Sequence, residues 1–134
     1  MTEAKELLKR HEGLRLKPYR CTAGRLTIGW GRNLEDKGIS RAEADILFEN
    51  DWAEAEAGAR TLVGNWDELS ENRKGVLVNM VYNMGLDGMR KWKNTLRCIE
   101  QGDFKGAAAN MRLSLWAKQV PNRAEELIRI MEEG

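Results

Sequence analysis

Residues 11–31, HEGLRLKPYRCTAGRLTIGWG, carry the clearest structural pattern of the chain. Apolar and β-branched residues alternate on both sides of Thr22-Ala23-Gly24, a pattern typical of two strands joined by a turn. Gly13 precedes this segment and is placed to end a helix over residues 2–11, for which Thr2 is the candidate N-cap. The sequence therefore predicts a β-hairpin over residues 14–31 directly after a first helix.

Helical periodicity returns after the hairpin and continues to the end of the chain. Its signals are a capping box of Ser40 with Glu43, a cap at Ser70, an end at Gly85, helices over 91–101 and 103–115, and Pro121 in the first turn of a last helix. These patterns predict a single domain of the α+β class that is mostly α-helical. We expect an αβ lobe over about residues 12–60 and a helical lobe of residues 61–134 together with helix 2–11. The cleft between two such lobes is the natural place for an extended substrate.

Composition narrows the class of protein. The chain has 134 residues and a net charge of +1, without the basic excess of a nucleic-acid binder. No apolar run approaches the roughly 20 residues that span a bilayer, so we expect no membrane insertion. The first ten residues are rich in charge and lack the apolar region of a secretory signal, so we expect none.

The two cysteines, Cys21 and Cys98, lie far apart in the sequence. In a chain without a secretory signal such a pair predicts two free thiols rather than a disulfide. Together with the single histidine, His11, they make no recognisable set of metal ligands. We therefore expect no metal and no organic cofactor.

Glu12 is the carboxylate whose setting points to chemistry. It lies in the last turn of the first helix, where a carboxyl group faces whatever the hairpin encloses. Cleavage of a glycosidic bond needs a proton donor beside the leaving oxygen and a second group that handles the opposite face of the sugar. Glu12 could be that donor, or it could be an ordinary carboxylate at a helix end.

A resemblance to a known family rests on spacing. Glu12, Cys21 and Thr27 are separated by eight and five residues, inside a hairpin that ends in Leu26–Gly31. This arrangement resembles the active-site hairpin of the phage lysozymes, glycoside hydrolase family 24, whose triad is Glu, then Asp or Cys, then Thr. Further similar segments follow in order: 79–85, 94–97, 108–110, Trp116 and 121–124. The similarity runs from Glu6 to about Leu127.

The resemblance implies an activity and roles for named residues. The activity is hydrolysis of the β-1,4 bond between N-acetylmuramic acid and N-acetylglucosamine in peptidoglycan, which lyses the cell wall. Glu12 would be the general acid, held by Arg123, and Thr27 would hold a water. The family's substrate contacts match Tyr82, Thr95 and Asn110. From the residues alone, Thr27 is equally a strand former, Arg123 an arginine in a first helical turn, Tyr82 a core residue, and Thr95 and Asn110 capping or surface residues.

Cys21 occupies the second position of the triad, at which members of the family have either aspartate or cysteine. A thiolate can deprotonate the attacking water or attack the anomeric carbon itself. A free thiol has a pKa of about 8.5. Arg20 and Arg25 would lower the pKa of Cys21 if they fold toward its sulfur. A small apolar thiol that has replaced a lost carboxylate is the alternative. Arg32, where many relatives carry histidine, is expected to change local ion pairing rather than chemistry.

The sequence is compatible with two alternative functions. The first is a lysozyme or endolysin, which we expect to be a monomer that stays in the cytoplasm of a host bacterium until a holin pore releases it to the periplasm and wall. The second is a lapsed lysozyme fold that binds peptidoglycan or protein without cutting it. Cys21 in place of a carboxylate and the exposed-looking Trp52 and Trp66 favour the second, whereas the retained Glu12 and Thr27 favour the first.

Overall fold

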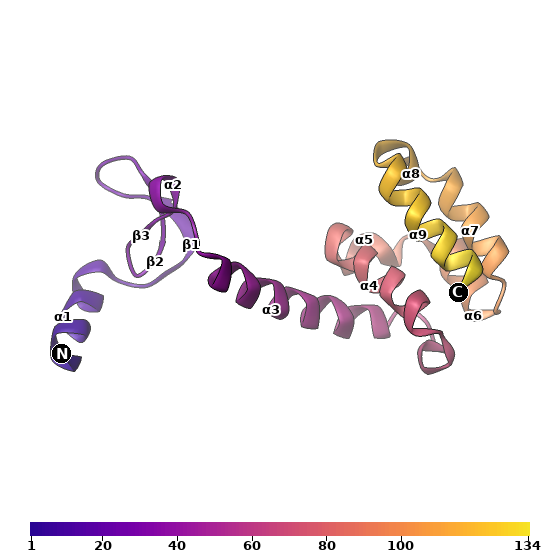
Figure 1. Cartoon of the computed structure of the whole chain (residues 1–134), viewed down its shortest axis with the longest axis horizontal. Coiled ribbons are helices and arrows are strands. Elements are labelled where there is room, and N and C mark those ends of the chain that lie inside the picture. Colours follow the sequence, from indigo (N-terminus) through magenta and orange to yellow (C-terminus); the bar gives the residue numbers. More distant parts are fainter. The chain divides into compact units, whose positions relative to one another are not determined.

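The structure, a computed structural model, describes all 134 residues. It divides into two compact units, residues 1–46 and residues 47–134, with the division inside one long helix. Figure 1 labels their elements. None of the helices combines the length and the apolar character that crossing a bilayer requires. The expected lobe limit near residue 60, and the expected place of helix 2–11 in the helical lobe, stay predictions.

The first unit begins with helix α1 (Thr2–Glu12), which ends at Gly13 as expected. The predicted cap at Thr2 is wrong, because Met1 is the N-cap and Thr2 already lies in the helix. Strands β1 (Arg15–Arg20), β2 (Leu26–Gly29) and β3 (Arg32–Asn33) then form an antiparallel sheet in the order β1-β2-β3. The first two strands are the predicted hairpin, paired through Tyr19 with Thr27 and through Arg20 with Leu26.

The sheet leads into helix α2 (Leu34–Lys37), which Asn33 caps through its side chain. Helix α3 (Arg41–Arg60) follows. The capping box at its start is confirmed: the Ser40 N–H donates to the Glu43 carboxylate at 2.8 Å, and the Glu43 N–H donates to the Ser40 hydroxyl at 3.1 Å. Two orphan amides of the first turn are satisfied in this way.

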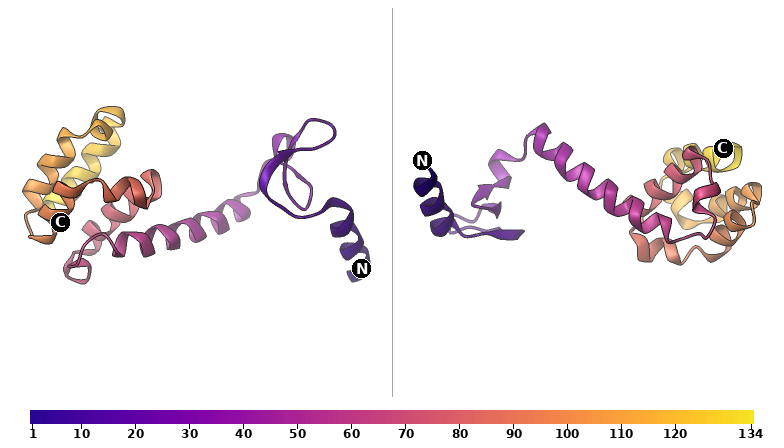
Figure 2. Two further views of the ribbon diagram at one scale, coloured as in Figure 1. Left: turned by 180° about the vertical axis from the view of Figure 1, so that it is seen from behind. Right: turned by 90° about the horizontal axis from the view of Figure 1, so that it is seen from below.

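The second unit is helical. After a short 3-10 helix, η1 (Trp66–Glu68), it contains α4 (Glu71–Met84), α5 (Leu86–Arg90), α6 (Lys93–Glu100), α7 (Phe104–Leu113), α8 (Leu115–Gln119) and α9 (Pro121–Glu133). The predicted cap at Ser70, end at Gly85 and N-terminal Pro121 are confirmed. Helix α7 packs between α6 and α9, as the views in Figure 2 also show.

The core of this unit consists of side chains from these helices, among them Leu77, Met80, Met89, Ile99, Met111, Ile128 and Met131. Trp66 belongs to the core with 6% of its surface exposed, so the prediction that it is exposed is wrong. Trp92 and Trp116 meet edge to face, with ring centroids 5.6 Å apart. The small antiparallel sheet and the many helices confirm the predicted fold class, α+β and mostly helical.

Candidate active site

Glu12, the last residue of α1, folds its side chain onto the backbone of Gly31. A Cβ added at Gly31 would lie 2.5 Å from Oε2 of Glu12 and 2.8 Å from its Cδ. Gly31 lies between β2 and β3 with a φ of 81°, a conformation that glycine adopts without strain. The carboxyl group therefore lies against the sheet segment, as its position in the sequence predicts.

Cys21 lies directly after β1, in the turn that leads to β2. Its N–H donates to the Arg25 carbonyl at 2.9 Å, and its own carbonyl accepts from the Gly24 N–H at 2.8 Å. The backbone amides of Arg25 and Ala23 hydrogen-bond to the sulfur and lower the pKa of the Cys21 thiol, against a smaller opposing effect of burial. The hydroxyl of Thr27 lowers this pKa further. The turn thus stabilises a thiolate.

The condition under which Arg20 and Arg25 would lower the pKa of Cys21, that they fold toward the sulfur, is not met. Both guanidinium groups turn instead toward the carboxylate of Glu35, with Nη1 atoms at 3.4 Å and 3.1 Å from its oxygens. Arg25 also lies 3.5 Å from Asp36, so acidic partners compensate both positive charges. Arg25 and the Leu26 amide in turn hold the pKa of Glu35 below its usual range. Backbone dipoles, and not side-chain cations, act on the sulfur.

Thr27 lies on β2 opposite Tyr19 and is 4% exposed. Its hydroxyl donates to the Arg25 carbonyl at 2.8 Å. A hydroxyl has one proton and two lone pairs, so in this arrangement the oxygen is free to accept from a water or a thiol. When the sulfur is ionised, the same proton can turn toward it, which accounts for the effect of Thr27 on the pKa of Cys21. Thr27 is thus both a strand former and a polar group beside the sulfur.

Thr95 and Asn110, on α6 and α7, line one open groove of about 310 Å³ in the second unit. Thr95 is 4% exposed, so it is neither a helix cap nor a surface residue. The Asn110 amide donates to the Gly106 carbonyl at 3.0 Å, and its nitrogen lies 3.6 Å from the sulfur of Cys98. The structure therefore brings two of the predicted substrate-contact residues together.

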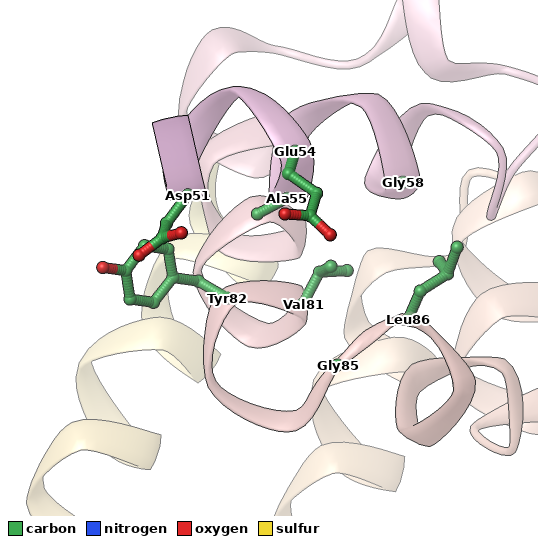
Figure 3. Close-up of a pocket in the computed structure, with 8 residues that line it drawn as sticks. All are labelled: Asp51, Glu54, Ala55, Gly58, Val81, Tyr82, Gly85 and Leu86. Atoms are coloured by element: carbon green, nitrogen blue, oxygen red, sulfur yellow. The ribbon is translucent and has the colours of Figure 1, made fainter. Parts of the chain in front are cut away.

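Tyr82, near the end of α4, lines a different pocket of about 310 Å³. The tyrosine is 42% exposed, so the core interpretation is wrong, and its ring centroid lies 5.9 Å from that of Phe48. Figure 3 shows the Asp51 carboxylate beside the phenol and Glu54 over the apolar side of the pocket. Sequence reasoning missed these two carboxylates. Their spacing of three residues on α3, which places both on one helix face, was the available signal.

Arg123 is the third residue of α9 and is exposed. This position in the first turn agrees with the sequence analysis. Its expected place beside Glu12 joins residues of the two units and stays a prediction. Within the first unit Arg32 forms a bidentate pair with Glu43 at 2.9 Å and 2.6 Å, in agreement with the expected local ion pairing. That the change leaves the chemistry unaffected stays a prediction.

The decisive comparison is with a family model. The model described as phage lysozyme matches residues 9–130, which include Glu12, Cys21 and Thr27. The chain belongs to the phage lysozyme family. As a member of this family it is a glycoside hydrolase, a muramidase that cleaves the glycan strands of bacterial peptidoglycan.

Named relatives agree with this assignment. "Probable T4-type lysozyme 2" of Dictyostelium discoideum is 31% identical over 163 aligned positions, which cover 100% of this phage lysozyme and 96% of that protein. "Endolysin" of Acyrthosiphon pisum secondary endosymbiont phage 1 is 32% identical, over 87% of the chain and 78% of the relative. "Pre-baseplate central spike protein Gp5" of Enterobacteria phage T4 is 31% identical over 96% of the chain, which corresponds to 27% of that larger protein.

Proposed function

We propose that this phage lysozyme hydrolyses the β-1,4 bond between N-acetylmuramic acid and N-acetylglucosamine with Glu12 as the acid and Cys21 as the second catalytic group. The observation that carries the proposal is the setting of Cys21. Backbone amides and the Thr27 hydroxyl lower the pKa of its thiol, on the same hairpin against which the Glu12 carboxyl group packs. An inert thiol that had merely replaced a lost carboxylate would not need surroundings that lower its pKa.

The bond-breaking step is an acid-catalysed displacement. Glu12 donates its proton to the glycosidic oxygen as the bond from the anomeric carbon to that oxygen breaks, and the bonding electron pair leaves with the oxygen. A nucleophile supplies a new pair to the anomeric carbon from the opposite face. Glu12 ends the step as a carboxylate, and the leaving sugar has gained a hydroxyl.

Cys21 can act in this step in two ways. As a thiolate it removes a proton from a water, which Thr27 helps to hold, and the water attacks the carbon with inversion. Alternatively the sulfur attacks directly and forms a thioglycosyl intermediate, which water then hydrolyses with Glu12 as the base and with overall retention. Both routes need the ionised sulfur, which the lowering of the Cys21 pKa favours. The anomer of the first-formed product distinguishes the two routes.

Residues of the second unit complete the proposed site. Thr95 and Asn110 would bind substrate from their shared groove, and Tyr82 from the pocket shown in Figure 3. Their positions in the walls of these two hollows support a binding role, as does the match to the family's pattern of contacts. Arg123 would orient the Glu12 carboxyl group. The single domain would then consist of an αβ lobe and a helical lobe with the substrate cleft between them.

The setting we propose is that of an endolysin. Such a protein would be a monomer, would remain in the cytoplasm of the host bacterium, and would reach the wall once a holin pore opens. The relative named "Endolysin" supports action on the wall after release.

The experiment that tests the function is clearance of chloroform-treated Gram-negative cells by the purified protein, compared with Glu12→Gln, Cys21→Ser and Cys21→Asp. We expect clearance by the parent and by Cys21→Asp, and loss in the other two while circular dichroism shows a retained fold. Full activity in Glu12→Gln would refute its role as the acid. An inactive parent that binds sacculi, beside an active Cys21→Asp variant, would instead identify a lapsed enzyme.

A further inference from the structure

We propose that Glu35 is a positioning residue for the hydrolysis, because its carboxylate holds residues 21–25, the loop that carries Cys21, in the conformation in which Cys21 acts. This inference rests on the proposed function, since it takes Cys21 to be a catalytic group. Glu35 is the second residue of α2 and lies outside the hairpin. Its hydrogen bonds go to residues beside Cys21 and not to Cys21 itself. Glu35 therefore acts through the loop and not on the substrate.

The Glu35 carboxylate joins the two ends of this loop. Arg20 ends β1 and Leu26 begins β2, and the two residues are paired across the hairpin. Oε1 of Glu35 accepts from Nη1 of Arg20 and from the N–H of Leu26, both at 3.4 Å. Oε2 accepts from Nη1 of Arg25 at 3.1 Å. One side chain thus binds both strands of the hairpin at the base of the loop.

Arg25 transmits this contact to the surroundings of the sulfur. Its carbonyl accepts from the Cys21 N–H at 2.9 Å and from the Thr27 hydroxyl at 2.8 Å. Its backbone amide has the largest effect among the groups that lower the pKa of Cys21. Because Glu35 fixes the side chain of Arg25, it also restrains the backbone groups of Arg25 that face Cys21 and Thr27.

Helix α2 is the element that ties this loop to the rest of the unit. The hydrogen bonds and ion pairs that link residues 20–26 to elements outside the hairpin go to Glu35 and to Asp36, which lies 3.5 Å from Arg25. At the tip of the loop, a Cβ added at Gly24 would meet nothing within 4 Å, so packing does not restrain that point. A single exposed ion pair contributes little, but a network contributes more. Removal of the Glu35 carboxylate removes three contacts at once.

Electrostatics and positioning predict opposite results for the loss of this carboxylate. Replacing Glu35 takes a negative charge from the neighbourhood of the sulfur and releases Arg20 and Arg25, changes that by themselves favour the thiolate of Cys21. An effect of charge alone therefore predicts a rate that is equal to that of the parent or higher. Loss of positioning predicts a lower rate, because a mobile loop holds the sulfur less often in the productive geometry.

The test is Glu35→Ala in the full chain, with two readouts. The first is hydrogen exchange, followed by NMR, of the Cys21 and Gly24 amides, which close the hydrogen bonds of the loop. We expect both amides to exchange about fivefold faster than in the parent. The second is steady-state hydrolysis of solubilised glycan strands, in which kcat should fall about tenfold while KM changes little. Glu35→Gln keeps an acceptor of the same length and should show smaller changes in the same directions.

Glu43→Ala is the matched control. Like Glu35, Glu43 lies in the first turn of a helix of the first unit, has a side chain that is 40% exposed and pairs with an arginine, but it contacts none of residues 20–26. Its loss should leave the exchange of the Cys21 and Gly24 amides unchanged. Unchanged exchange at these amides in Glu35→Ala, an equal acceleration in Glu43→Ala, or a kcat of Glu35→Ala at or above that of the parent would overturn the proposal.

The role of Cys21 itself is judged separately, by the clearance of cells by Cys21→Ser. If Cys21→Ser clears cells as the parent does, the proposed role of the thiol fails, whatever the exchange rates show. If Cys21→Ser is inactive and the exchange of the loop does not respond to Glu35→Ala, the proposed function stands and the role of Glu35 fails.

Discussion

The carboxyl group of Glu12 occupies the space in which a side chain at Gly31 would stand. An added Cβ at Gly31 would lie 2.5 Å from Oε2 of Glu12, a distance that real Cβ atoms do not tolerate. The position of the Glu12 carboxyl group therefore depends on Gly31 having no side chain. This relationship ties the end of α1 to the stretch between β2 and β3, and it can be tested without altering either proposed catalytic side chain.

We predict that Gly31→Ala lowers the rate of peptidoglycan hydrolysis by about 100-fold, because the new methyl group displaces the Glu12 carboxyl group. Gly29→Ala is the matched control. Gly29 has a similar positive φ of 71°, but an added Cβ there meets nothing within 4 Å. Both variants store similar backbone strain, so both should lose similar stability, and only Gly31→Ala should lose most of its kcat. Equal kcat in the two variants would contradict the positioning role of Gly31.

The pKa of the Cys21 thiol should be lower than that of an ordinary free thiol, because backbone amides of the turn and the Thr27 hydroxyl stabilise the thiolate. The rate of alkylation by iodoacetamide, followed at the Cys21 peptide by mass spectrometry across pH, measures this pKa directly and separates Cys21 from Cys98. Thr27→Val should raise the pKa, because it removes a hydroxyl that stabilises the thiolate, and Thr27→Ser should largely restore it. A midpoint for the parent at or above that of a free cysteine would contradict the geometry of the turn.

The pH dependence of hydrolysis should follow the same group. Because both routes need an ionised residue 21 together with a protonated Glu12, the pH profile of kcat/KM should change when the ionising group at position 21 is exchanged. In Cys21→Asp the limb of the profile that residue 21 sets should move to far lower pH, since a carboxyl group ionises at about 3.9. Steady-state rates on solubilised glycan strands from pH 3 to about 9 provide the measurement. Superimposable profiles of the two proteins would show that residue 21 does not titrate in the rate-limiting step.

The ion pair of Arg32 with Glu43 should make the stability of the first unit depend on pH. Arg32, with help from Ser40, lowers the pKa of Glu43 from its usual 4.5 to about 2. A folded-state pKa below the unfolded one means that the contribution is fully present above about 4.5 and is lost as the pH falls toward about 2. Glu43→Gln should therefore be less stable than the parent at pH 7, and the gap should narrow in acid.

Urea unfolding of the parent and of Glu43→Gln at pH 7, 4 and 3 measures this gap. Glu6→Gln serves as the control, because Glu6 forms a single exposed contact with Lys9 at 3.8 Å in the same unit. Exposed pairs of this kind contribute little to stability. A difference between parent and Glu43→Gln that stays constant from pH 7 to pH 3 would argue against the assigned pKa.

Much of the fold could be predicted from the sequence because its signals are local. The capping box of Ser40 with Glu43, the cap at Ser70 and the glycine at position 85 act over three or four residues, so each is complete in the sequence itself. The hairpin is specified in the same way, by alternation on both sides of a short turn. Short elements such as β3, α2 and α5 were missed, because two to five residues are too few to display a period.

The family, the hairpin and the spacing of Glu12, Cys21 and Thr27 can be read from the sequence, since folding leaves the spacing along the chain unchanged. Which groups act on those three residues depends on how the chain packs in three dimensions. Arg20 and Arg25 are close to Cys21 in sequence, yet they pair with Glu35, and backbone amides stabilise the sulfur instead. Thr95 and Asn110 share a groove only because α6 packs on α7. Packing determines which charged groups come close enough to pair and which residues line a groove. The spacing of residues along the sequence does not contain this information.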